Sequence, residues 1–207
     1  MGCYETKRHK FPAMPLGLKI ASVAMNALEV EHAHAGELFA IVDLGEHHCA
    51  GCMGDGIQVI TGCTFGKGNI VRSMKGKFSV TLIDQKQKRG VKITPFGSWL
   101  QKAFQSEFMK KRQKGIPPHH ITPEIVDPLI ENILSMPVEK QFNIEMIDNI
   151  KVDVPSHKWD KRLCEKCNEL TVAEYGYYIN DQFLCAGCSE MTIGHLGHRR
   201  SLSILEN

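Results

Sequence analysis

The sequence has no hydrophobic run long enough to cross a membrane as a helix. No window reaches the ~18 uncharged apolar residues that such a span requires. The opening stretch MGCYETKRHKFP contains no apolar segment of signal-peptide length. These absences exclude a helical membrane protein and predict a cytoplasmic location.

The sequence also has no strong excess of charge of either sign. Its 25 Lys and Arg residues nearly balance its 23 Asp and Glu residues, for a net charge of +2. A general nucleic-acid binder is usually more basic, so we do not expect a nucleic-acid partner for the whole chain. The C-terminal part is locally basic through Lys158, Lys161, Arg162, Lys166, Arg199 and Arg200.

What the sequence does contain is cysteine, at eight positions. Cys164-x-x-Cys167 and Cys185-x-x-Cys188 are separated by 17 residues, a spacing typical of a four-cysteine zinc site. A two-residue gap lets a turn aim both thiolates at one ion, and four thiolates leave no open position on zinc. We therefore predict a structural zinc ion here, with redox-active dithiols as the alternative.

The residues around these pairs indicate a small zinc module. The stretch between the pairs predicts a hairpin that turns at Asn180-Asp181. The second pair opens a predicted short helix, and the combination of turn, hairpin and helix resembles a treble-clef zinc finger. His195 and His198 are further candidate ligands, but four cysteines already complete the site, so we expect both histidines at the surface.

The composition changes at a polar linker over residues 155–161, which predicts two domains, 1–154 and 155–207. Apolar periodicity in the first predicts helices and strands mixed along the chain. The predicted helices cover residues 16–31, 54–61, 99–111 and 123–136, and the predicted strands cover 37–44, 77–84, 91–96 and 140–152.

A second cluster of reactive side chains lies between His47 and Asn69. Thiolates and imidazoles near a carboxylate favour zinc or a similar transition metal. Cys52 lies near a predicted helix start, a position that also suits a nucleophile. Cys63 is a candidate ligand, with a buried core thiol as the alternative. Lys67 could bind an anionic group, although the phosphate-loop pattern GxxxxGK[ST] is incomplete.

The run CMGDGIQVITGCTFGKGN, from Cys52 to Asn69, resembles the signature of the FmdE family of formylmethanofuran dehydrogenase proteins. That signature reads roughly C-x-x-D-A-I-Q-x-x-T-G-C-T-x-G-K-G-N. The resemblance implies an α+β core whose antiparallel sheet is flanked by helices, often with a treble-clef finger and commonly as a dimer. The family takes its name from molybdenum or tungsten enzymes that handle one-carbon units on methanofuran.

The segment before the first helix departs from the family pattern. Members usually carry His-Gly-His-x-Cys-Pro-Gly there, whereas residues 7–13 of this chain read KRHKFPA. Phe11 stands in the place of the cysteine, while His9 is retained. His47, His48 or Cys49 are candidates to replace the missing ligand.

Three functional hypotheses arise from these residues. The first is a metal-binding subunit or accessory protein of a molybdenum or tungsten dehydrogenase, with zinc or a related metal at a core site of His9, His48, Cys52 and Cys63. The second is a free-standing enzyme acting on a small carbonyl or formyl substrate, with the catalytic set Cys52, Asp55, Cys63 and Lys67. In that enzyme Cys52 attacks, Asp55 moves protons and Lys67 holds an anionic group. The third is a zinc-finger interaction module.

Overall fold

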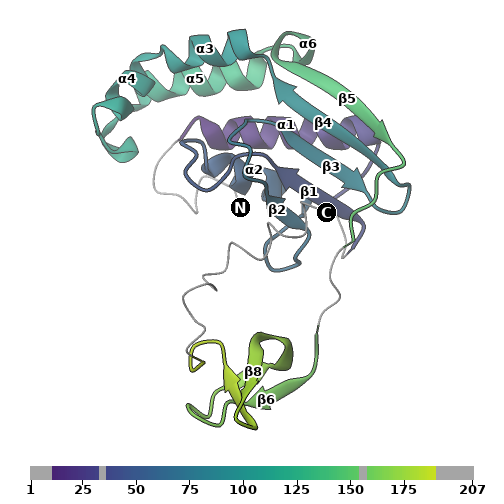
Figure 1. Cartoon of the computed structure of the whole chain (residues 1–207). Coiled ribbons are helices and arrows are strands. Elements are labelled where there is room, and N and C mark those ends of the chain that lie inside the picture. The colour runs from purple at the N-terminus through teal and green to yellow at the C-terminus, as the bar shows by residue number, and fades with distance from the viewer. Residues whose placement is uncertain (1–10, 33–35, 154–157, 190–207) are drawn as a thin grey trace. The chain divides into compact units, whose positions relative to one another are not determined.

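The computed structural model describes residues 11–32, 36–153 and 158–189. The chain divides into two compact units, residues 1–152 and 153–207 (Figure 1). Among the described residues, none of the helices combines the length and apolar character needed to cross a membrane.

A five-stranded sheet forms the framework of the first unit, in the order β2-β1-β3-β4-β5. Three antiparallel pairings join β1 to β3, β3 to β4 and β4 to β5, while β1 and β2 run parallel. The strands are β1 (Leu38–Val42), β2 (Ile70–Arg72), β3 (Val80–Asp84), β4 (Arg89–Pro95) and β5 (Phe142–Asp148). The predicted α+β class with a largely antiparallel sheet is confirmed.

Helix α1 (Ala13–Leu28) packs its apolar side chains against one face of this sheet. Its Ile20, Ala24 and Leu28 are fully buried, at the period of about four residues expected of one helix face. Leu82 and Ile93 belong to the same buried cluster and provide the sheet side of the core. The burial of this face is the main hydrophobic contribution to folding.

Helix α2 (Cys52–Thr61) crosses α1 at unusually short range, and two glycines make this possible. A Cβ atom at Gly17 would lie 2.1 Å from the carbonyl oxygen of Met53. A Cβ atom at Gly56 would lie 2.5 Å from the carbonyl oxygen of Met14. The two backbones are therefore in direct contact, and any side chain at either glycine would push the helices apart.

The segment between β4 and β5 is helical, but its helices differ from the prediction. The single helix expected over residues 99–111 is two helices, α3 (Gly97–Phe104) and α4 (Glu107–Gln113). The break falls where Ser106 adopts extended backbone and its side chain accepts a hydrogen bond from the Met109 amide at 3.4 Å. This serine cap starts a new helix, which periodicity alone did not indicate.

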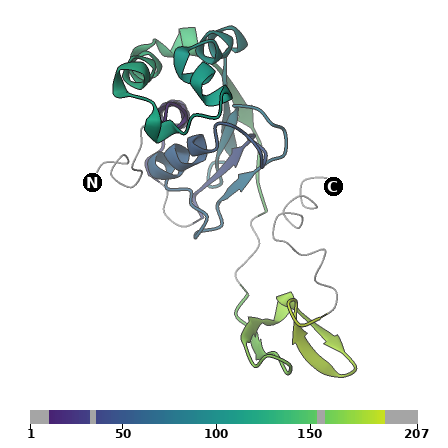
Figure 2. The same ribbon diagram turned by 90° about the vertical axis from the view of Figure 1, so that its left-hand side faces the viewer.

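The remaining helices follow a short 3₁₀ turn at Pro118–His120. They are α5 (Pro123–Ser135), close to its predicted range, and the one-turn α6 (Val138–Gln141), which takes the first residues of the strand predicted over 140–152. Lys19 of α1 donates a hydrogen bond to the Ile133 carbonyl of α5 at 2.8 Å. Figure 2 views α1 nearly end-on, with α2 and the helices of this segment around it.

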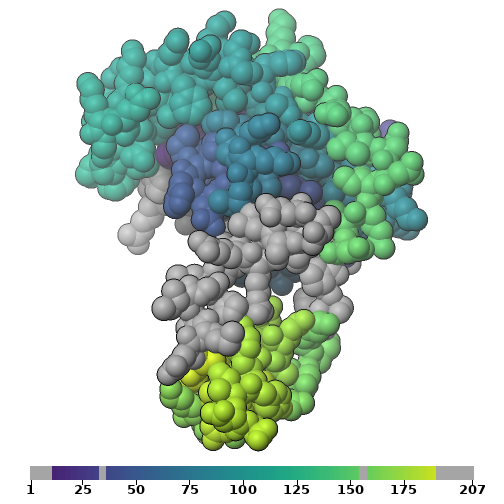
Figure 3. Space-filling model, in the orientation of Figure 1, coloured from purple at the N-terminus to yellow at the C-terminus, as the bar shows by residue number. Residues whose placement is uncertain are grey.

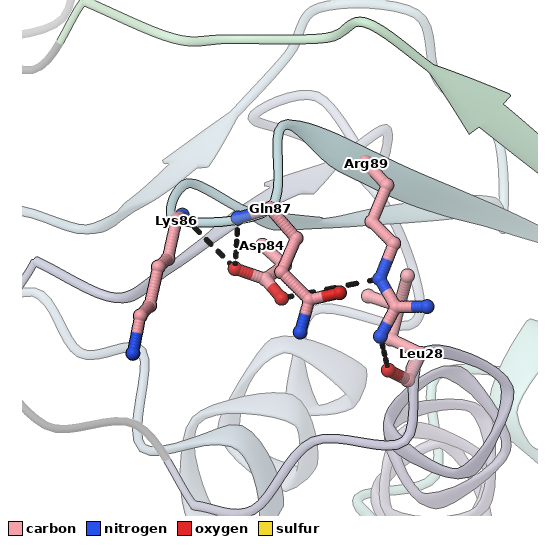
Figure 4. A network of polar contacts seen from close by, with 5 residues as sticks. All are labelled: Leu28, Asp84, Lys86, Gln87 and Arg89. Carbon is pink, nitrogen blue, oxygen red and sulfur yellow. Dashed lines mark hydrogen bonds and ion pairs between the residues drawn. The ribbon is translucent and has the colours of Figure 1, made fainter.

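The turn between β3 and β4 is tied to the end of α1 by a polar network (Figure 4). The Asp84 carboxylate accepts hydrogen bonds from the backbone amides of Lys86 and Gln87, at 2.9 and 3.0 Å. Arg89 lies 4.0 Å from the same carboxylate and donates a hydrogen bond to the Leu28 carbonyl in the last turn of α1. A cation at a helix C-terminus satisfies an unpaired carbonyl and complements the helix dipole.

The short strand β2 was absent from the prediction, and the residues around it hold a buried carboxylate. Asp43 is 1% exposed and accepts hydrogen bonds from the hydroxyls of Ser73 and Ser79, at 2.6 and 2.9 Å. Lys75 adds an ion pair at 3.3 Å. Burial of this charge is tolerated because its oxygens are satisfied by these neighbours.

The second unit is made of two small antiparallel ribbons. Strand β6 (Lys161–Leu163) pairs with β7 (Leu170–Val172), and β8 (Gly176–Ile179) pairs with β9 (Gln182–Cys185). A 3₁₀ turn at Ala173–Tyr175 joins the ribbons. The turn of the second ribbon falls at Asn180-Asp181, as predicted, and both residues have positive φ.

The crossing of α1 and α2 can be tested with two neighbouring glycines of α2. We expect Gly56→Ala to lower the free energy of unfolding by about 1–3 kcal/mol or more, because the new methyl group meets backbone atoms that cannot move aside. Nothing lies within 4 Å of the corresponding Cβ position at Gly54. Gly54→Ala should therefore raise the stability by up to about 1 kcal/mol through helix propensity. Urea unfolding of both variants measures the two changes, and equal effects would contradict the direct backbone contact.

Candidate functional site

Four cysteine side chains converge in the second unit. Cys164 follows β6, Cys167 lies in the next turn, Cys185 ends β9 and Cys188 lies in the turn after it. Their sulfur atoms all lie within 4.8 Å of one another. The tertiary structure therefore brings together the two pairs that the spacing singled out.

The first pair sits on a turn closed by backbone hydrogen bonds. The amide of Asn168 donates to the Cys164 carbonyl at 2.8 Å, and the Cys164 amide donates to the Glu169 carbonyl at 3.0 Å. Asn168 takes a left-handed conformation with φ 60°. Asparagine tolerates this region better than most residues, which lets the chain reverse directly after Cys167.

The second pair is held against the first by the hairpin. The Cys185 amide donates a hydrogen bond to the Cys164 sulfur at 3.3 Å, and the Cys188 amide donates to the Cys185 carbonyl at 3.0 Å. Glu165 joins the two halves, because its amide donates to the Phe183 carbonyl at 2.9 Å and its carboxylate accepts from the Phe183 amide at 2.8 Å. These bonds fix the relative position of the two turns.

The geometry and electrostatics of the four sulfurs fit a divalent ion. Tetrahedral zinc with Zn–S bonds of about 2.3 Å places its sulfurs about 3.8 Å apart. The sulfurs of Cys167 and Cys185 are 3.8 Å apart. Backbone amides of Cys167 and Cys185 lower the pKa of Cys164 to about 6, whereas hydrogen bonds to the neighbouring sulfurs of Cys167 and Cys185 raise the pKa of Cys188 to about 12. A bound cation relieves this conflict, because it stabilises all four thiolates together.

Part of the predicted finger falls outside the described residues. The helix expected after the second pair would continue beyond residue 189, and His195 and His198 lie there too. Within the described part, residues 186–189 form a turn.

The signature run in the first unit forms α2 and the loop that follows it. The Thr61 hydroxyl donates to the Ile57 carbonyl at 2.8 Å and accepts from the Cys63 amide at 3.0 Å. Gly62 ends the helix with φ 69°, and a Cβ atom there would lie 2.4 Å from the His32 ring. Thr61 and Gly62 therefore have a structural reason to stand at the end of this helix.

The rest of the loop is closed by Lys67 and Asn69. The Lys67 ammonium donates a hydrogen bond to the Gly62 carbonyl at 3.0 Å. The buried Asn69 side chain accepts from the Thr64 amide at 2.8 Å and donates to the Leu38 carbonyl of β1 at 3.0 Å. The signature thus joins the end of α2 to the parallel pair β1 and β2.

The structure places the predicted catalytic residues at two ends of one helix. Cys52 and Asp55 lie in the first turn of α2, whereas Cys63 follows its last residue. With a rise of 1.5 Å per residue, the helix separates these ends by about 14 Å, whereas two sulfur ligands of one zinc ion lie about 4 Å apart. This separation argues against one ion held by both thiols.

Cys63 is fully buried in the apolar core. Burial raises the pKa of its thiol to about 11, against smaller opposite effects of Thr61 and Lys67. The thiol is therefore protonated at neutral pH, as expected of a core cysteine.

His48 and Cys49 lie in the loop before α2. The His48 Nδ1 atom accepts a hydrogen bond from the Ala50 amide at 3.1 Å, and its ring packs edge-on against Phe78 with centroids 4.4 Å apart. Burial, with a smaller effect of Arg72, lowers the pKa of His48. Cys49 is exposed, and burial of part of its surface raises the pKa of its thiol.

The core metal set of His9, His48, Cys52 and Cys63 stays a prediction. His9 lies outside the described residues. Among the residues that are described, the group of three or more His, Cys, Asp or Glu side chains close enough to share an ion is the four-cysteine cluster.

The fold and the site together define an α+β protein with an appended four-cysteine metal module. A family model described as "FmdE, Molybdenum formylmethanofuran dehydrogenase operon" matches residues 8–143. The chain belongs to this family, which confirms the resemblance seen in the signature run.

Two further comparisons agree with the family. An FmdE-like protein of tungsten formylmethanofuran dehydrogenase from Syntrophus aciditrophicus has a similar fold, with a TM-score of 0.56 and 20% identity over 88% of this chain and 85% of that one. A probable S-adenosyl-L-methionine-binding protein from Archaeoglobus fulgidus is 31% identical over 180 residues, which are 82% of this chain and 47% of that protein. The chain thus spans about half the length of this relative.

The burial of Cys63 leads to a labelling prediction. At about pH 8, below the ordinary pKa of a cysteine, N-ethylmaleimide should modify Cys49 in the native protein and leave Cys63 unmodified. In urea both thiols should react. Peptide mass spectrometry gives the extent at each residue, and native reaction of Cys63 at the rate of Cys49 would contradict its place in the core.

Proposed function

We propose that the chain is a metal-binding protein of the FmdE family, located in the cytoplasm, that serves a molybdenum or tungsten formylmethanofuran dehydrogenase or a related one-carbon enzyme as a subunit or accessory factor. The observation that carries the metal-binding part is the convergence of Cys164, Cys167, Cys185 and Cys188. Family membership supports the link to the dehydrogenase.

The metal in this proposal is a structural zinc ion within a treble-clef finger. Four thiolate ligands suit zinc and leave no position for a substrate or water. Among residues 158–189, the buried side chains are Cys164, Phe183 and Ser189. So small a core does not hold a unit of this size together without further support, and the metal supplies it.

The finger also presents apolar side chains that suit a protein partner. Trp159 is 80% exposed and Leu170 65% exposed, with Tyr178 at 62%. Exposed apolar groups gathered in a unit with so little core are typical of interaction surfaces. This supports an accessory or subunit role and gives the interaction-module hypothesis a place within it.

Homodimer formation belongs to the same proposal, with β5 as the contact. Strand β5 ends the order of the sheet, and its outer edge has no strand partner among the described residues. Ile144 and Met146 lie opposite the buried Ile93 and Val91 of β4, yet are 42% and 49% exposed. In Figure 3 this green segment lies on the surface at the rim of the first unit. An apolar free edge is a template for pairing with a second copy.

The free-standing enzyme remains the alternative to this proposal. Cys52 is half-buried in the first turn of α2, a position open enough for a nucleophile. Lys67 bonds to the Gly62 carbonyl within its own loop, which gives it a structural task as well.

Metal analysis tests the zinc centre and the core site at once. We expect about one zinc per chain, lost in Cys167→Ser and retained in Cys52→Ser, because four thiolates bind far more tightly than three. Two metals in the natural chain that fall to one in Cys52→Ser would establish the core site instead. After chelation, limited proteolysis should cleave the second unit first, and an intact metal-free finger would contradict a structural ion.

Size-exclusion chromatography with light scattering tests the partners. The chain alone should have the mass of two copies, and Ile144→Asp with Met146→Asp should give one copy because the edge becomes charged. Val59→Asp is the control, since Val59 is equally exposed, at 49%, on α2. Mixed with purified molybdenum or tungsten formylmethanofuran dehydrogenase, the chain should co-elute. Separate elution at micromolar concentrations would contradict the accessory role.

A further inference from the structure

The first unit contains an apolar cavity that neither the metal centre nor the signature loop uses. Its volume is about 300 Å³, and it lies among the start of α1, the loop before α2 and the helices α3, α4 and α5. Five aromatic side chains and one thiol line it: Phe11, Phe78, Trp99, Phe104, Phe108 and Cys49.

Ring contacts keep the walls of the cavity in place. Phe11 meets Phe108 edge-on with centroids 5.5 Å apart, and Phe78 meets Phe104 edge-on at 5.7 Å. His48 packs against the other side of Phe78. Each pair joins segments far apart in the chain, so the rings hold one another and the space between them stays open.

The chemistry of the lining selects an uncharged ligand. Within the described part of the chain, no Asp or Glu lines the cavity, and the polar lining residues other than Cys49 are Lys102, Ser106 and Asn132. Lys102 and Asn132 are exposed, so their polar ends are available to water. A charged ligand would lose its hydration here without gaining partners for its charge.

The volume sets the size of the ligand. Protein interiors are close-packed, so an apolar space this large is unusual unless something fills it. An apolar cavity of about 150 Å³ accepts benzene, and ligand sites begin at about 300 Å³. The space therefore suits a molecule of about two aromatic rings.

We propose that this cavity binds an uncharged aromatic molecule of about two fused or linked rings, with Cys49 at its mouth. Edge-on packing against the five aromatic side chains provides the contacts, and the burial of apolar surface provides most of the affinity. The proposal does not depend on the zinc centre or on the dehydrogenase.

N-phenyl-1-naphthylamine, a neutral aromatic fluorophore, is the probe. We expect the full chain to bind one molecule with a rise in probe fluorescence. Naphthalene should displace it at lower concentration than nonanol, an alkyl compound with about as many non-hydrogen atoms. Bound probe should slow the alkylation of Cys49 about tenfold or more, because it covers the thiol from the cavity side.

Two variants of α5 locate the binding. Leu129 lines the cavity, whereas Leu134 does not and is 50% exposed. Leu129→Trp should weaken binding about tenfold or more by filling the space, and Leu134→Trp should leave it unchanged. If Leu129→Trp does not fold, Cys49 protection in the natural chain decides. Absent binding, equal affinity of both variants, tighter binding of nonanol, or unchanged alkylation of Cys49 would each overturn the proposal.

Discussion

The direct contact between the backbones of α1 and α2 is the constraint on which the first unit depends. Gly17 and Gly56 allow an approach that no side chain would permit. Because α1 also covers the sheet, this contact fixes α2 relative to β1, so that the loop after α2 reaches β2 in the register that makes β1 and β2 parallel. The one parallel pairing in the sheet follows from how closely two helices pack.

The signature of the family is explained largely by this architecture. Thr61, Gly62 and Asn69 end a helix, reverse the chain and fasten it to β1. Cys63 fills part of the core. A run of residues that looks reactive in the sequence therefore has mostly structural tasks, since Gly, Thr and Asn serve tight turns for the same reasons that they occur in binding loops. The positions that remain open to chemistry are Cys52 at the start of α2 and Cys49 in the loop before it.

The two units solve the problem of stability differently. The first buries a continuous apolar core between α1 and the sheet. The second has few buried side chains, and its order rests on hydrogen bonds around four sulfurs that a divalent ion can bind together. A metal centre in the second unit and an aromatic-lined cavity in the first are thus separate features of one chain, each argued from its own residues.

The sequence by itself determined the α+β class, most helices and strands, and the four cysteines of the metal centre. These follow from local pattern: apolar periodicity sets helices and strands, and a two-residue gap sets the turn that aims two thiols at one point. It did not reveal the break at Ser106, the short strand β2, the separation of Cys52 from Cys63 or the cavity. Each of these is decided by contacts between segments far apart in the chain, such as Phe11 with Phe108 or Gly56 with Met14. Only packing in three dimensions brings such segments together, because no local periodicity encodes which distant side chains will meet.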